Sequence, residues 1–292
     1  MRNHRTPEAF TLIELLVVIA IIGMLLAILI PSLKAAKEIA SVANCLSNEK
    51  GLAQGYILYA EQNDDNFCSG YVFPDVTDRD PPSWVKPPLV YNADGSQVYV
   101  GTDPVRLTQE ARKNGIREGA IYPYVESVDL YHCPGDRRII KGTSRRTGSE
   151  PLSMYQCFRS YGMPDFYSIH VDRPYDNERK LSNIRVPSQK ILFVEDQYDL
   201  YYNIDGWSYY PYRQMLWDPL GNYHNKSCTF AFVDGHAEHH KWRDNRTMIF
   251  MSDRQMAADM GFGKNVKFDP HNVDLDWLDA HYPAKTRLKG GD

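Results

Sequence analysis

Apolar residues are concentrated in one segment near the start of the chain. Residues 10–30 form a run of 21 residues that contains a single charged side chain, Glu14. A helix rises about 1.5 Å per residue, so this run would span roughly 30 Å, the thickness of the hydrocarbon core of a bilayer. The pattern therefore predicts one transmembrane helix over 10–30.

The helical pattern continues beyond the apolar run. Apolar residues recur at close to helical spacing as far as Ala60, with charged residues such as Lys34 and Glu49 at the positions between them. The turn-forming side chains of residues 63–66 then end the pattern. We expect one helix from about residue 10 to about residue 62, whose second half, 31–62, offers an apolar stripe to a globular head.

Strand signals appear in the second half of the chain. Residues 191–194 form a short apolar run, and residues 228–233 and 236–242 flank Asp234-Gly235, a dipeptide that favours a two-residue hairpin turn. Alternation places Cys228, Phe230 and Phe232 on one face of the first hairpin strand. The predicted fold class is α+β, with a long N-terminal helix packed on an antiparallel β-sheet head.

The remaining segments complete the predicted domain organisation. Residues 69–118 are rich in Pro, Asp, Gly and Tyr with little periodicity, which predicts a long surface loop within a globular head of residues 63–292. A basic run follows, and its composition favours a solvated loop over a nucleic-acid-binding surface. Its members are Arg137, Arg138, Lys141, Arg145 and Arg146. No nucleic-acid partner is therefore expected.

Composition limits the class of protein. The mean hydropathy is −0.48, which excludes a protein with several membrane spans. With 12% aromatic residues and a formal net charge of −4, the chain can bury a core, so a disordered protein is also excluded. The apolar segment is thus a single span on an otherwise hydrophilic, aromatic-rich protein.

Charges before the apolar run predict its orientation. Arg2 and Arg5 precede it with only one acid, Glu8, so the N-terminus should stay cytoplasmic and the rest should be exported. An ordinary signal peptide is the alternative. Its apolar region is usually about 7 to 15 residues long, shorter than this run, and the nearest small-x-small site, at residues 41–43, lies more than ten residues beyond the run.

Glu14 is unusual because it lies inside the apolar run. A carboxylate at the centre of a membrane helix costs roughly 2.5 to 3.5 kcal/mol on insertion scales, which makes an intramembrane acid a functional candidate. If the chain were cut before Phe10, a new α-ammonium would begin the helix close to this carboxylate. The two charges could then neutralise each other, within one chain or between neighbouring copies.

Residues 9–16 read Ala-Phe-Thr-Leu-Ile-Glu-Leu-Leu and resemble the type III signal of type IV prepilins and type II secretion pseudopilins. The resemblance implies that residues 1–9 are a cytoplasmic leader, that a prepilin peptidase cleaves between Ala9 and Phe10, and that Phe10 is then N-methylated. It also implies that Glu14 acts with Phe10 in subunit assembly. Ala9 stands where the family usually carries glycine.

A second resemblance lies near the C-terminus. His224 is followed after nine residues by Asp234-Gly235, which is similar to the C-terminal motif of a large group of prepilin-like proteins. Residues 130–136, 159–163 and 187–192 also resemble intermediate blocks of that group. This resemblance implies common ancestry and does not specify an activity.

Metal ligation is a weaker possibility. His236, Glu238 and His240 share one face of a predicted strand, and His224 could lie near the hairpin base, so these residues could ligate zinc. Same-face neighbours on a strand are nearly 7 Å apart, however, which favours a solvated face. We therefore assign no metal site and no cofactor from the sequence.

The resemblance to major pseudopilins allows a structural calcium ion, but no EF-hand spacing identifies its ligands, and surface acids or helix caps are the favoured interpretation. The acidic groups considered are Asp64, Asp65, Asp196, Asp199, Asp205, Asn272, Asp274, Asp276 and Asp279.

The chain has five cysteines, and an exported head permits disulfides. Cys133 with Cys157, and Cys45 with Cys68, are the reasonable pairs. Cys228 is expected to be a buried free thiol because it alternates into an apolar face.

These features favour a non-enzymatic subunit of a type IV pilus-like or type II secretion pseudopilus filament. The partners implied are a prepilin peptidase, an inner-membrane assembly platform, the membrane, and copies of the chain itself or other pilins. The chain would first be a single-pass inner-membrane protein and then part of a periplasmic or extracellular filament.

Two alternatives stay open. One is a membrane-tethered extracytoplasmic module that binds glycans or proteins and uses its signal only for export. The other is an anchored hydrolase that uses His224 and Asp234.

Overall fold

The computed structural model describes residues 11–72, 81–100, 108–136, 158–167, 180–196, 206–211, 215–216, 218–252, 266–267 and 271–283. The chain divides into two compact units, Met1–Ala40 and Ser41–Asp292, and we call the second the head unit. A long helix followed by antiparallel sheets confirms the predicted α+β class.

Helix α1 spans Leu12–Gln62 and continues through Pro31, as the sequence pattern predicts. Its end is set by the polar residues that follow. The backbone N–H groups of Asn63 and Asp65 both donate to the carbonyl of Ala60. Asp64 and Asp65 adopt the left-handed conformation, with φ of 54° and 66°, which acidic side chains tolerate better than most and which cannot continue a helix.

The part of α1 that belongs to the head unit buries one stripe. Cys45, Glu49, Leu52, Tyr56 and Tyr59 recur every three or four residues and are all buried, so they share one face of the helix. The prediction that Glu49 is a polar position between the apolar ones is wrong. The stripe that contacts the head passes directly through it.

The main sheet of the head unit has four antiparallel strands in the order β3-β4-β7-β8. Their bounds are Tyr161–Gly162 for β3, Ile191–Glu195 for β4, Ser227–Phe232 for β7 and Ala237–Lys241 for β8. The predicted hairpin is confirmed as β7–β8, with Cys228 opposite His240. Its turn is longer than the predicted two residues, because the Phe232 N–H donates to the His236 carbonyl, and Gly235 but not Asp234 has a positive φ. All residues of β4 and β7 are buried, as expected of central strands covered on both faces.

Smaller elements surround this sheet. The helices are α2 Gln109–Arg117, α3 Tyr122–Val125, α5 Asn245–Ser252 and α7 Val273–His281. The further strands are β1 Leu89–Tyr91 with β2 Gln97–Tyr99, and β5 Tyr209–Tyr210 with β6 Met215–Leu216 and β9 Val266–Lys267. The 3₁₀ turns within the described residues include η1 Val128–Tyr131, η3 Asp165–Tyr167, η4 Leu181–Asn183 and η5 Pro187–Gln189.

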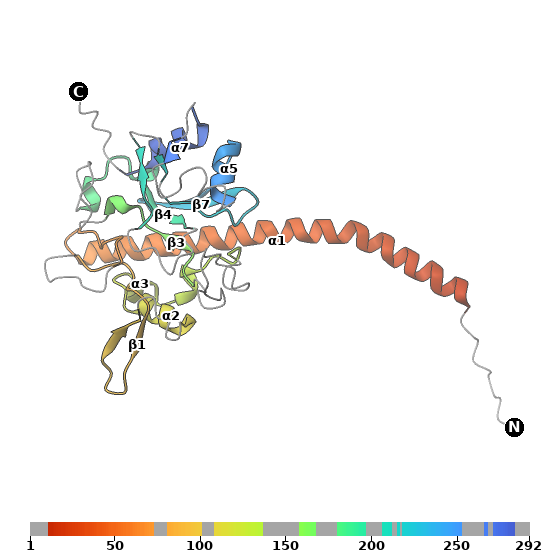
Figure 1. Cartoon of the computed structure of the whole chain (residues 1–292), viewed down its shortest axis with the longest axis horizontal. Helices are drawn as coiled ribbons and strands as arrows, with labels where there is room; N and C mark the ends of the chain where they lie inside the picture. The colour runs from red at the N-terminus through yellow and green to blue at the C-terminus, as the bar shows by residue number, and fades with distance from the viewer. Residues whose placement is uncertain are drawn as a thin grey trace. The chain divides into compact units, whose positions relative to one another are not determined.

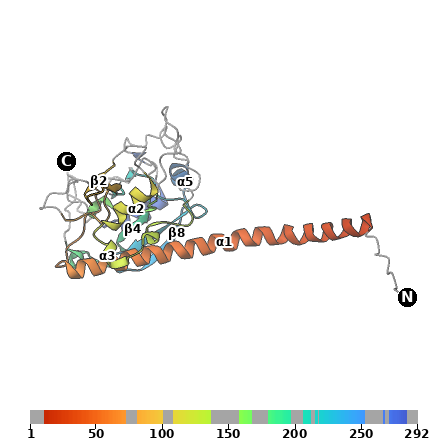
Figure 2. The same cartoon turned by 90° about the horizontal axis from the view of Figure 1, so that it is seen from below.

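Within the head unit, α1 runs alongside the main sheet in both views (Figures 1 and 2). In Figure 1, β4 and β7 lie on one side of this part of α1, and α2, α3 and β1 lie on the other. The segment 69–118, which we expected to be a surface loop, therefore contains regular structure. It also supplies core residues, since Trp84 and Leu89 have no exposed surface.

Aromatic side chains fill the core between α1 and the sheet. Tyr56 of α1 meets Phe193 of β4 edge-on, with ring centroids 6.1 Å apart, and Trp84 lies 5.3 Å from Phe193 and stacks on Tyr131. Such pairs contribute beyond the area they bury. Core packing thus accounts for many of the aromatic residues of this sequence.

Candidate functional site

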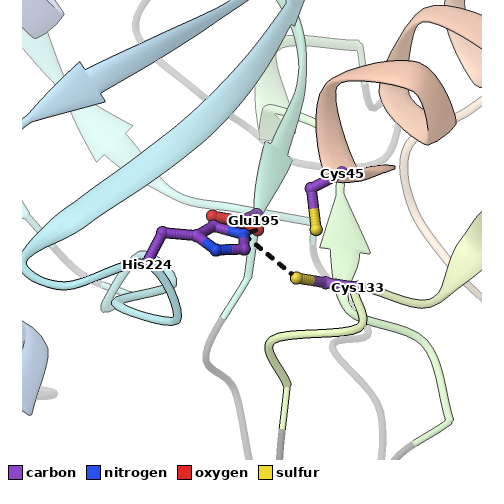
Figure 3. A group of neighbouring side chains, drawn as sticks. All are labelled: Cys45, Cys133, Glu195 and His224. Carbon is purple, nitrogen blue, oxygen red and sulfur yellow. Dashed lines mark hydrogen bonds and ion pairs between the residues drawn. The ribbon is translucent and has the colours of Figure 1, made fainter. Parts of the chain in front are cut away.

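Four buried side chains with metal-binding donor atoms converge in the head unit. Cys45 comes from α1, Cys133 from the turn after η1, Glu195 from the end of β4 and His224 from the loop before β7. One donor atom of each lies within 4.8 Å of the other three, and no residue is more than 2% exposed. Figure 3 shows the four side chains pointing toward one another. We call them the Cys-Cys-Glu-His cluster.

The His224 ring nitrogen Nε2 faces several acceptors at once. It lies 2.9 Å from Glu195 Oε1 and 3.2 Å from Cys133 Sγ, and Cys45 Sγ belongs to the same group. A ring nitrogen carries at most one proton, so it cannot make a full hydrogen bond to each neighbour. The remaining contacts among these atoms must use the thiol protons of the cysteines.

The pKa values of Cys45 and His224 are shifted in opposite directions within the cluster. A hydrogen bond with Cys133 lowers the pKa of the Cys45 thiol to about 7, although burial opposes this. Burial alone would lower the pKa of His224, but hydrogen bonds to Cys45 and Glu195 raise it to about 10. Both directions favour a thiolate beside a protonated imidazole, the state to which nearby opposite charges lead.

Backbone groups hold two of the donors in place. The Thr229 N–H donates to Glu195 Oε2 at 2.9 Å, and the Gly135 N–H donates to Cys133 Sγ at 3.3 Å. Gly135 also lets the chain pass close to the imidazole, because a Cβ there would lie 2.9 Å from His224 Cε1. Gly135 therefore contributes both a hydrogen bond to Cys133 and the space that the His224 ring occupies.

A second buried carboxyl group lies next to the cluster. Glu49 is one helical turn after Cys45 on α1 and has no exposed surface. Burial, followed by the charges of Glu195 and Cys45, raises the pKa of Glu49 well above its usual value. A protonated Glu49 avoids placing another anion beside Glu195.

The N-terminal part of α1 has the opposite character, since its apolar side chains face outward on all sides. The large apolar residues from Leu12 to Ile30 are between 45% exposed, at Val18, and 78% exposed, at Leu12. Among the described residues, α1 is the one helix long and apolar enough to cross a membrane. A surface of this kind needs lipid or other apolar helices around it.

Glu14 caps the beginning of this helix. The Thr11 N–H and hydroxyl both donate to Glu14 Oε2, at 2.8 and 2.7 Å, and the Glu14 N–H donates to Thr11 Oγ1 at 3.3 Å. This reciprocal pattern is a capping box, in which a Thr and a Glu three residues later satisfy backbone groups at the helix start. Glu14 thus has a local role in the single chain.

A family model described as the prokaryotic N-terminal methylation motif matches residues 7–30. Residues 7–30 carry a type IV prepilin-like signal. No curated protein and no solved structure matches the chain. The match includes Ala9, Phe10 and Glu14, and together with the apolar helix it indicates membrane anchoring. Ala9 and Phe10 lie outside the described residues, so cleavage and methylation of the prepilin signal stay predictions.

The structure separates the two halves of the predicted C-terminal motif. His224 belongs to the Cys-Cys-Glu-His cluster. Asp234 and Gly235 lie in the β7–β8 turn, where Asp234 is exposed, Gly235 is buried with a φ of 89°, and Asp234 Oδ1 lies 2.5 Å from His236 Nδ1. The pair expected for a hydrolase, His224 and Asp234, therefore has separate partners. The resemblance of this motif to prepilin-like proteins stays a prediction.

The strand residues considered for zinc do not gather into a ligand group within the described part of the chain. His236 contacts Asp234 and stacks on Phe232, with ring centroids 4.4 Å apart. His240 instead stacks on Trp277 at 4.1 Å.

The predicted disulfides are not formed. Cys45, Cys68 and Cys133 are all free thiols, and Cys157 lies outside the described residues. The physical reason is the register of α1, which turns Cys45 toward Cys133 and His224 rather than toward Cys68. Cys228 is a buried free thiol, as expected.

The acidic groups considered for calcium act largely as hydrogen-bond acceptors. Asn272 caps α7 by accepting from the N–H groups of Asp274 and Leu275, and Asp65 accepts from the Ser182 N–H at 3.1 Å. Asn272 is thus a helix cap, as the favoured interpretation allows, whereas Asp196 and Asp274 are buried and are not surface acids. Asp199 and Asp205 lie outside the described residues.

Proposed function

We propose that this chain is a non-enzymatic subunit of a type IV pilus-like or type II secretion pseudopilus filament. The observation that carries the proposal is the first part of α1, which exposes apolar side chains all round. The carboxylate of Glu14 caps its beginning. The prepilin-like signal over 7–30 supports the same function, since the matched motif is typical of structural subunits.

Processing prepares the helix for assembly. Cleavage between Ala9 and Phe10 by a prepilin peptidase makes Phe10 the first residue and leaves a positive charge, which N-methylation retains. This ammonium then precedes the Thr11–Glu14 capping box directly in the sequence. A positive terminus and a carboxylate four residues apart form a complementary pair that a neighbouring copy can share.

Assembly depends on that pair because apolar contact alone gives the helix little preference for the filament core over the bilayer. Lipid tails are as apolar as the side chains of α1, so moving the helix from bilayer to filament core gains mainly packing and polar contacts. A charge pair between Glu14 of one copy and Phe10 of the next would also remove the penalty for an isolated acid in an apolar surrounding. It would fix the axial position of each new subunit.

Location and partners follow from this route. The leader stays cytoplasmic, the head unit is exported, and the chain waits as a single-pass inner-membrane protein. An assembly platform in the same membrane then moves it into a periplasmic or extracellular filament of identical or related subunits.

Substitutions at the capping box separate the roles of Glu14. Gln can replace Glu in a capping box, so Glu14→Gln should keep the helix start, membrane insertion and cleavage, yet abolish filaments. Thr11→Ala removes a capping partner but keeps the charge, and we expect it to assemble. Filaments are scored by electron microscopy of sheared surface material, and mass spectrometry should find an N-methylated Phe10 terminus. Normal filaments from Glu14→Gln would refute the mechanism.

The competing function is a membrane-tethered module that binds glycans or proteins. The compact head unit, which has its own core from Ser41 onward, is the observation that favours it. In that case the chain would be processed and exported, but it would be absent from sheared filaments of wild-type cells.

A further inference from the structure

We propose that Cys45, Cys133, Glu195 and His224 form a structural metal site that binds one zinc ion. The proposal concerns the head unit and does not depend on filament assembly, so its outcome is separate from that of the proposed function. Four observations carry it: the spacing of the donor atoms, their chemical types, their burial, and the backbone groups that orient them.

The spacing of the donor atoms suits tetrahedral coordination of an ion after a small adjustment of the side chains. With zinc–ligand distances of about 2.0 to 2.3 Å, the edges of a tetrahedral site measure roughly 3.4 to 3.8 Å. The Nε2 of His224 lies 2.9 Å from Glu195 Oε1 and 3.2 Å from Cys133 Sγ. All four donor atoms lie within 4.8 Å of one another. The two short contacts therefore need to lengthen by about half an ångström, and any pair as far apart as that limit needs to close by about one ångström, to admit the ion.

The donor types select zinc over calcium. Two cysteine sulfurs, an imidazole nitrogen and a carboxylate oxygen are the ligands that zinc takes in proteins, whereas calcium needs six to eight oxygens. The two thiolates and the carboxylate carry one more negative charge than a divalent cation neutralises, and the N–H groups of Thr229 and Gly135 stabilise that excess. The ion would replace the protons that now lie between His224 Nε2, Glu195 Oε1 and the two sulfurs.

Burial indicates a structural role. The four residues are at most 2% exposed, so the site supplies four protein ligands and no position open to a substrate, as in structural zinc sites. The ligands come from α1, the turn after η1, β4 and the loop before β7. One ion would thus tie the helix of the head unit to three other segments.

Contacts around the ligands match those of a formed metal site. The N–H groups of Thr229 and Gly135 donate to Glu195 Oε2 and Cys133 Sγ. Hydrogen bonds of this kind fix ligand orientation and are part of most metal centres. Gly135 leaves the room that the His224 ring occupies, since a Cβ there would lie 2.9 Å from Cε1.

A disulfide between Cys45 and Cys133 is the alternative that the exported location allows. It would join the two sulfurs by oxidation, but it would not explain why His224 and Glu195 lie beside them. The contact between Cys133 Sγ and His224 Nε2 favours metal ligation, and the redox state of the two thiols is therefore measured in the test.

The first experiment uses the full-length chain, extracted in detergent without chelators. We expect about one zinc per chain by elemental analysis, and mass spectrometry after alkylation under denaturing conditions should show Cys45 and Cys133 both reduced. Replacement of zinc by cobalt should produce the intense thiolate-to-cobalt absorption of a tetrahedral site. Removal of the ion should lower Tm by about 10 °C, because the ion binds only the folded state.

Matched variants assign the ligands. Cys133→Ser and His224→Gln should each lose the bound zinc and the cobalt absorption. Cys68→Ala is the control, because Cys68 is an equally buried free cysteine of the same unit that does not belong to the cluster. It should retain the full metal content.

Several results would overturn the proposal. They are a wild-type chain that takes up neither zinc nor cobalt with its thiols reduced, a Cys45–Cys133 disulfide in the purified protein, and zinc retained by both ligand variants. An equal loss in Cys68→Ala would also overturn it. If the ligand variants do not fold, the cobalt spectrum and the effect of chelation on wild-type Tm still decide the question.

Discussion

Two glycines one turn apart on α1 should respond to alanine in opposite ways. Gly51 and Gly55 both lie in the part of the helix that belongs to the head unit. A Cβ at Gly51 would meet Leu130 Cδ2 at 3.4 Å, an ordinary contact, whereas a Cβ at Gly55 would lie 2.4 Å from Val125 Cγ1. The added methyl group therefore makes an ordinary contact at one site and overlaps an occupied position at the other.

The magnitudes follow from helix propensity and packing. Replacing a helix-interior glycine by alanine gains about 1 kcal/mol, so Gly51→Ala should stabilise the head unit by that amount. At Gly55 the same gain is opposed by a contact more than an ångström inside the usual carbon–carbon separation. Overpacking of this kind costs up to about 3 kcal/mol, so Gly55→Ala should be destabilising by about 2 kcal/mol.

Denaturant unfolding of the full chain in detergent measures both effects. The five tryptophans are Trp84, Trp207, Trp217, Trp242 and Trp277. All of them belong to the head unit, so their fluorescence reports its unfolding. The expected changes correspond to a Tm about 2 to 4 °C higher for Gly51→Ala and about 4 to 8 °C lower for Gly55→Ala.

A double substitution tests the cause. Val125→Ala removes the methyl group that occupies the space, so Gly55→Ala combined with Val125→Ala should be less destabilised than the sum of the two single changes. Equal stability of Gly51→Ala and Gly55→Ala would refute the reasoning, and so would strict additivity of the pair.

Two further predictions concern acid stability and backbone packing. Burial would raise the pKa of Asp274, but the His240 imidazole, 3.6 Å away, and hydrogen bonds from the N–H groups of Asp244 and Arg243 lower it below its usual value. This stabilisation should be present above about pH 4 and disappear as the pH falls further. Asp274→Asn should therefore lower Tm at pH 7 but not at pH 3; an equal gap at both would contradict the assignment. At Gly119, a Cβ would lie 2.2 Å from the carbonyl oxygen of Trp84, so Gly119→Ala should cost about 3 kcal/mol or more, and a wild-type melting curve would disprove this.

Much of the fold follows from local sequence signals. The apolar run predicts the exposed first part of α1, and residues 63–66 predict its end, because both depend on neighbouring residues alone. The β7–β8 hairpin is predicted by Asp234-Gly235 for the same reason, since the dipeptide accepts the backbone angles of the turn. The prepilin-like signal is also local, and the family match over 7–30 agrees with it.

The sequence does not predict the Cys-Cys-Glu-His cluster. Cys133 and His224 do lie in segments that resemble motifs of prepilin-like proteins, but those motifs specify no ligand group. The members of the cluster are 29 or more residues apart in the sequence, on four different elements. No helical or strand periodicity relates positions so far apart in the sequence. The packing of α1 on the sheet brings them together. Proximity in the sequence favours a disulfide between Cys45 and Cys68, which the structure does not form.

The sequence by itself determined the membrane helix, its signal and the hairpin, since each depends on residues that are adjacent or one helical turn apart. Tertiary structure decided which side of α1 faces the head, and that choice buries Glu49 and turns Cys45 toward His224. The physical reason is that a helix periodicity marks several possible faces, and only contact with β4, β7 and the turn at Cys133 selects one of them.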